Sequence, residues 1–106
     1  MNVTVIEKLE KGWIKMDWKE TIHRVRLGKE DMSELVDKVD RFKGNRSAKE
    51  IILFRYKGLP VYVTIQRKEY GELLDWLMGR FIEMEWYEGC VNVTKIKSKI
   101  KSLVNS

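Results

Sequence analysis

Apolar and polar residues alternate in three segments near the start of the chain. The positions that recur with period two are Val3 and Val5, then Ile14, Met16 and Trp18, then His23, Val25 and Leu27. Such alternation places one set of side chains on the buried face of a β-sheet and the other set on the opposite face. Because the intervening segments are short, the pattern predicts three consecutive antiparallel strands joined as a meander.

The period becomes helical between residues 29 and 43. Acidic residues occupy the first turn, Gly44 ends the pattern, and one face is apolar. The residues of that face are Met32, Leu35, Val36, Val39 and Phe42. The sequence therefore predicts an amphipathic helix over 29–43, followed by a loop over 44–49, where Gly, Asn, Arg and Ser gather.

A hairpin and two helices complete the pattern. Strands over 50–57 and 61–65 flank a turn that contains glycine and proline. Apolar residues return to helical spacing over 70–82, and again in a last helix that begins at 92–94. The sequence thus predicts one α+β domain over 1–106, an antiparallel five-stranded sheet in β-β-β-α-β-β-α-α order, with helices packed mainly on one face.

Positive charge is concentrated at the end of the chain. The net charge is +5, and residues 91–106 contain four lysines and no acidic residue. Those lysines are Lys95, Lys97, Lys99 and Lys101. A local surplus of this kind lets a bound polyanion release its counterions. The same lysines also suit the solvent-facing side of a docked helix, whose isoleucines pack while the lysines flank them.

The cysteine content and the apolar runs bear on the cellular compartment. Cys90 is the single cysteine, so an intramolecular disulfide is impossible and a reducing compartment is favoured. Charged residues interrupt the first apolar stretch, unlike the core of a signal peptide. Nor does any segment approach the ~20 apolar residues that cross a bilayer. We therefore expect a cytoplasmic protein that does not enter a membrane.

The outer face of the predicted sheet combines cations with aromatic rings. Its residues are Trp13, Lys15, Arg24, Arg26, Arg55, Tyr62 and Thr64. Bases stack on aromatic side chains with ~1–3 kcal/mol each, while Arg and Lys contact phosphates. We therefore predict a nucleic-acid-binding face, supported by Lys95 and Lys99 of the last helix. The alternatives are an ordinary solvated sheet surface, or a face covered by helices.

A second candidate surface lies near the end of the long helix. Arg80, Trp86 and Tyr87 stand there beside Met84. Aromatic residues and arginines are enriched at the centres of protein interfaces, so this cluster predicts a protein partner or a homodimer. Packing of the aromatic rings into the core is the competing explanation.

Catalytic constellations are weak in this chain. His23 is the single histidine and has no acid at a spacing that would orient it, and Cys90 has no activating neighbour. The triplet 17–19, Asp-Trp-Lys, resembles the acid-x-Lys pair of a metal-dependent nuclease if Glu7 or Glu10 lies on a neighbouring strand. A triplet of this kind is also expected by chance in a chain rich in lysine and acids.

The sequence as a whole predicts a small non-enzymatic binding module without a metal or other cofactor. Nucleic acid is the favoured ligand, because the net charge, the outer sheet face and the last helix point the same way. The alternative is a protein-binding adaptor or inhibitor, of the sort that mobile elements and phages encode, acting through exposed aromatic residues. A metal-dependent nuclease ranks third.

Overall fold

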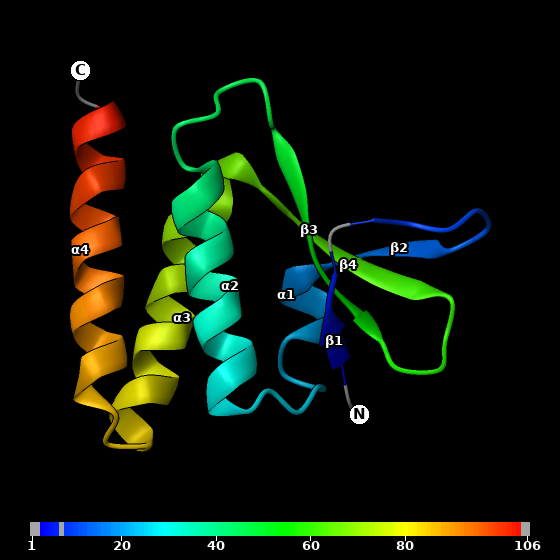
Figure 1. Ribbon diagram of the computed structural model, residues 1–106, viewed down its shortest axis with the longest axis horizontal. Coiled ribbons are helices and arrows are strands. Elements are labelled where there is room, and N and C mark those ends of the chain that lie inside the picture. The colour runs from blue at the N-terminus through cyan, green and yellow to red at the C-terminus, as the bar shows by residue number, and fades with distance from the viewer. Residues whose placement is uncertain (1–2, 7, 105–106) are drawn as a thin grey trace.

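The computed structural model describes residues 3–6 and 8–104 (Figure 1). Three long helices lie side by side at one end of the molecule, and the sheet lies at the other. In chain order the elements are β1 (Val3–Val5), β2 (Ile14–Asp17), α1 (Trp18–Thr21), α2 (Lys29–Phe42), β3 (Glu50–Tyr56), β4 (Val61–Gln66), the 3-10 turn η1 (Arg67–Glu69), α3 (Tyr70–Glu83) and α4 (Tyr87–Val104).

The four strands form one mixed sheet in the order β1-β3-β4-β2. β3 is antiparallel to both β1 and β4, whereas β2 runs parallel to β4. The predicted five-stranded antiparallel sheet is therefore wrong in strand number and in direction. β1 and β2 lie at opposite edges instead of forming a hairpin. A parallel pair needs a long crossover, which α1, α2 and β3 supply between β2 and β4.

The strand predicted over 23–27 does not form, because the chain turns into a helix directly after β2. The carboxylate of Asp17 accepts a hydrogen bond from the amide of Lys19 at 3.1 Å and so caps α1. Trp18 and Ile22 then enter the core, where they are 4% and 1% exposed. The Asp side chain competes in this way with the backbone hydrogen bonds of a strand, so Asp is unfavourable inside strands and favoured at helix starts.

The helices α2 and α3 and the β3–β4 hairpin occupy the segments that the apolar pattern predicted. The helix α4 starts earlier than predicted, at Tyr87. Glu85, with a φ of 56°, turns the chain sharply between α3 and α4. Gly89 then allows close packing, since a Cβ there would lie 2.6 Å from the ring of Trp86 and 2.9 Å from that of Phe81.

One hydrophobic cluster fills the space between the three long helices and the inner face of the sheet. The sheet contributes Phe54 and Val63, which are paired across β3 and β4 and fully buried. On the opposite face Arg55 and Tyr62 are half-buried, whereas Thr64, which the sequence pattern placed on the outer face, is buried at 5% exposed. Lys38 of α2 is also buried, and its ammonium donates to the carbonyl of Ile6, which ties α2 to the end of β1.

Candidate nucleic-acid interface

Four of the predicted site residues meet on the outer face of the sheet. The register aligns Arg55 with Tyr62 and Tyr62 with Lys15 across β3, β4 and β2. Trp13 lies just before β2, and the guanidinium carbon of Arg55 is 4.2 Å from the centre of its indole ring. This distance is that of a cation–π contact. The sheet thus assembles a cluster of Trp13, Lys15, Arg55 and Tyr62.

The cations of this cluster are engaged within the protein. Lys15 pairs with Glu50 at 3.1 Å, and because β4 separates their strands, this ion pair crosses over β4. Arg55 donates from Nη2 to the carbonyl of Leu59 at 2.8 Å and from Nε to that of Tyr56 at 3.2 Å. These bonds fix the turn between β3 and β4. Of the two cations, Lys15 is thus paired with a carboxylate, whereas Arg55 bonds to carbonyls and keeps its charge but lies against the Trp13 ring.

The other predicted residues lie away from this cluster. Arg24 and Arg26 are exposed in the segment 22–28 between α1 and α2, because the strand that would have carried them is missing. Lys95 and Lys99 are exposed on α4, which Figure 1 shows at the end of the molecule opposite the sheet. The predicted nucleic-acid-binding residues therefore fall on three separate parts of the surface.

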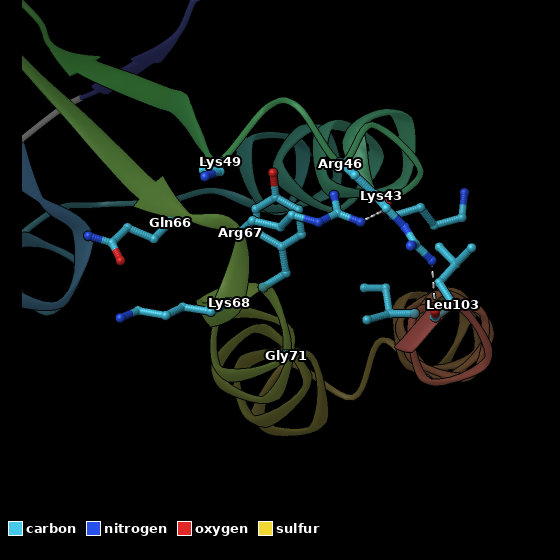
Figure 2. Close-up of a pocket in the computed structure, with 10 residues that line it drawn as sticks. Lys43, Arg46, Lys49, Gln66, Arg67, Lys68, Gly71 and Leu103 are labelled. Carbon is cyan, nitrogen blue, oxygen red and sulfur yellow. Dashed lines mark hydrogen bonds between the residues drawn. The ribbon is translucent and has the colours of Figure 1, made fainter. Parts of the chain in front are cut away.

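A basic pocket that the sequence did not predict lies where the ends of α2 and β4 and the start of α3 meet the last turns of α4 (Figure 2). Its volume is about 730 Å³. Half of its lining residues are cationic, and no Asp or Glu lines it within the described residues. The lining residues are Lys43, Arg46, Lys49, Gln66, Arg67, Lys68, Tyr70, Gly71, Ile100 and Leu103.

Arg67 builds the pocket by fixing the loop 43–49. Its Nη1 donates to the carbonyls of Phe42 at 3.1 Å and Asn45 at 3.2 Å, and its Nη2 donates to that of Lys43. The last carbonyls of a helix have no intrahelical donor, so these bonds satisfy the end of α2. The amide of Arg67 also donates to the carbonyl of Lys49 at 2.7 Å. This clamp holds α2 and the start of α3 together.

The other cations of the pocket differ in their partners. Lys43 pairs with Asp40 at 2.5 Å. Arg46 donates to the carbonyl of Leu103 at 3.2 Å, which is a dipole and not a full charge. Lys49 and Lys68 are exposed and lack an ion pair with any described residue. Arg46, Lys49, Arg67 and Lys68 are therefore four cations without a carboxylate partner in the described part of the chain.

The side chains differ in direction as well. In Figure 2, Arg46 and Arg67 extend into the space between α2, α3 and α4, whereas Lys68 and Gln66 point away from it. A smaller hollow adjoins the pocket and is lined by Lys43, Lys99, Ser102 and Leu103. One of the two lysines predicted from the last helix thus lies beside the basic pocket. Together these groups make a positive surface that extends beyond the pocket itself.

Tyr70 lines the pocket, and its hydroxyl is buried away from solvent. The residue is 2% exposed, and its hydroxyl forms no hydrogen bond within the described residues. A buried hydroxyl without a partner costs about 1–3 kcal/mol. Burial raises the pKa of Tyr70, and the guanidinium of Arg67, 5.9 Å from the ring centre, partly offsets that rise. The hydroxyl therefore keeps its proton at neutral pH.

Exposed apolar side chains gather where α3 turns into α4. They are Ile82, Met84, Tyr87 and Val91, which are 55%, 42%, 65% and 52% exposed and which we call the helical-turn patch. Glu85 and Glu88 lie in the same turn and are exposed. The patch therefore combines an apolar surface with neighbouring negative charge.

The residues predicted for protein binding divide between this patch and the core. Tyr87 belongs to the patch. Trp86 turns inward, with its ring edge-on to Phe81 at 4.9 Å and the ammonium of Lys29 4.3 Å from the ring centre. Arg80 is exposed and pairs with Glu83 at 2.9 Å. Of the two predicted aromatic residues, Tyr87 is thus the one that presents its ring to solvent.

The arrangement expected of a metal-dependent nuclease is not present among the described residues. The carboxylate of Asp17 caps α1, and β1 and β2 are not neighbours. Lys19 reaches α3 instead, where it pairs with Glu72 at 2.9 Å and Glu69 at 3.0 Å. Hydrogen bonds to these two carboxylates raise the pKa of Lys19. Glu7, one of the acids considered, lies outside the described residues.

His23 is exposed and lies edge-on to Trp76 at 6.4 Å, and Cys90 is half-buried in α4. Within residues 3–6 and 8–104, no group of three or more His, Cys, Asp or Glu is placed to hold a metal ion. None of the helices described there has the length and apolarity needed to cross a bilayer.

Comparison with protein-family models, curated proteins and solved structures gave no match.

Proposed function

We propose that this protein is a nucleic-acid-binding module without enzymatic activity, and that it binds through the basic pocket and its flanking lysines. The observation that carries the proposal is the gathering of four cations that lack a carboxylate partner within the described residues: Arg46, Lys49, Arg67 and Lys68. A polyanion that neutralises such a group releases its own counterions, which drives binding without sequence preference.

The outer sheet face is a weaker candidate for the same function. Lys15 is neutralised by Glu50, and Arg55 covers one side of the Trp13 ring on which a base would stack. The basic pocket instead keeps its charge and adjoins Lys99 of α4. Nucleic acid is the abundant polyanion of the cytoplasm, the reducing compartment that a single cysteine favours.

Removing three of these cations is expected to weaken binding and its dependence on salt. In Arg46→Ala/Lys49→Ala/Lys68→Ala, the slope of log affinity against log salt for a mixed-sequence single strand should shrink by about 2, because each phosphate contact contributes ~0.7. Fluorescence anisotropy of a labelled oligonucleotide across a salt series measures this slope.

The matched control removes the same charge from elsewhere. Lys8, Lys11 and Lys57 are exposed and lie outside the pocket, so replacing all three with alanine lowers the net charge equally. We expect this control to lose much less affinity than the pocket variant. Equal losses in the two variants would mean that binding follows net charge and not the pocket, and absence of binding to any strand at low salt would end the proposal.

Protein binding is a second candidate function, and the helical-turn patch favours it. Apolar side chains next to Glu85 and Glu88 suit a partner protein that presents cations around an apolar centre. Contiguous exposed apolar residues on small domains mark interaction sites more often than scattered ones do. A protein that co-purifies with the chain and is lost on Tyr87→Ser would support this second function.

A further inference from the structure

The pocket wall is not purely cationic, and this bears on what it binds. Ile100 and Leu103 of α4 form an apolar side, and the two guanidinium groups of Arg46 and Arg67 extend into the same space. A volume of about 730 Å³ lies within the range of small-molecule sites, which combine an apolar lining with a few placed polar groups. A ligand that fits this wall has an anionic group joined to an apolar or aromatic body.

The arginines retain donors for such an anion. A guanidinium has five N–H groups. Three hydrogen bonds from Arg67 reach backbone carbonyls, and one from Arg46 reaches Leu103, so both side chains keep donors that are not used within the described residues. Arginine binds phosphate through two parallel hydrogen bonds, and a phosphate monoester carries about −1.5 to −2 charge. Several cations without acid partners match that charge better than the single charge of a carboxylate.

We infer that the basic pocket is a site for one phosphate-bearing nucleotide, with the phosphate on the two guanidinium groups and the base against the apolar wall of α4. The inference rests on the proposed function and deepens it, because the nucleotide is either the phosphorylated end of a bound strand or a free nucleotide. In both cases the phosphate lies on Arg46 and Arg67.

The test compares probes that differ only in the terminal phosphate. A short strand with a 5′-phosphate is expected to bind about tenfold more tightly than the same strand with a 5′-hydroxyl, as measured by calorimetry. Adenosine 5′-monophosphate is the second probe. If adenosine 5′-monophosphate binds and no strand does, the site is one for free nucleotides. That result would overturn the proposed function but not the inference of a nucleotide site.

Two variants separate the pocket from the surface around it. A Cβ added at Gly71, which lines the pocket, or at Gly79, which does not, meets no atom within 4 Å. Both glycines lie in α3, where leucine is the better helix former, so both leucine variants should fold. Gly71→Leu is expected to abolish the preference for the 5′-phosphate by occupying the pocket, and Gly79→Leu to preserve it.

Equal affinity for the strands with a 5′-phosphate and with a 5′-hydroxyl would overturn the inference, and so would an undiminished preference for the 5′-phosphate in Gly71→Leu. If strand binding still depended on salt in either case, the proposed function would stand. Binding of laurate in place of the nucleotide would also overturn the inference.

Discussion

Arg67→Ala is expected to lower the free energy of unfolding by about 3 kcal/mol, since hydrogen bonds to a charged group contribute about 1.5–3 kcal/mol each and are not additive. The guanidinium of Arg67 bonds to three carbonyls at the end of α2 and in the loop that follows. Alanine removes the link between α2 and the start of α3 and takes the Arg67 donor from the Lys43 carbonyl. The carbonyls of Phe42 and Asn45 keep backbone donors, the amides of Asn45 at 3.0 Å and Ala48 at 3.2 Å. Urea unfolding followed by circular dichroism measures the loss.

Two variants serve as controls for the Arg67 clamp. Lys68 is the next residue, is exposed and has no ion pair with a described residue, so Lys68→Ala should change stability by less than about 0.5 kcal/mol. Arg67→Lys keeps the charge but loses the planar fork, and should recover less than half of the stability. An Arg67→Ala protein as stable as the wild type would show that the clamp does not hold the helices together.

Trp86→Ala is expected to destabilise the protein by about 3 kcal/mol, the low end for a large aromatic truncated in a packed site. The ring meets Phe81 edge-on at 4.9 Å, receives Lys29 on its face, and lies so close to Gly89 that no Cβ fits there. Its removal opens a cavity between α3 and α4. Thermal unfolding monitored by circular dichroism measures the effect as a fall in Tm.

Tyr87 is the matched control for Trp86 and decides how protein binding is tested. It is the next residue and is 65% exposed, so Tyr87→Ala should stay within about 0.5 kcal/mol of the wild type. If Trp86→Ala no longer binds a partner protein, unfolding explains the loss as well as a missing contact does. If Tyr87→Ala no longer binds it, the missing contact is the explanation. A fully stable Trp86→Ala protein would show that the ring is a surface group after all.

The helices α2 and α3 were predictable because their signal is local. In α2, Met32, Leu35 and Val39 recur at helical spacing, and each is fully buried against the core. The β3–β4 hairpin was equally local, since Gly58 takes the positive φ of 79° that its turn requires. Periodicity over many residues and turn chemistry leave few alternatives for such segments.

The sheet was harder to predict because alternation specifies a face but not a partner. Residues 14–17 do form a strand, yet pairing of β2 with β4 depends on packing between segments far apart in the chain. In the segment 23–27 the alternation correctly indicated that Val25 and Leu27 pack against the core, where both are half-buried. It was wrong for His23, which is exposed, and no strand forms there. The cap by Asp17 had already ended β2.

The candidate site shows the same division between local and long-range information. Alternation correctly placed Lys15, Arg55 and Tyr62 on one face, but it gave no sign that Glu50 neutralises Lys15 across β4. The cations of 43–49 and 67–68 were visible in the sequence as parts of a loop and of a short connection. Only the docking of α4 beside them makes a pocket, and that contact has no local sequence signal.

The most direct test of the proposed function maps the binding surface residue by residue. In a titration of ¹⁵N-labelled protein with a mixed-sequence single strand at low salt, we expect the amide shifts to move in 43–49, 66–71 and 99–103, which border the basic pocket. Shifts confined to the sheet face around Trp13 and Tyr62, shifts confined to the helical-turn patch, or no shifts at all would contradict it.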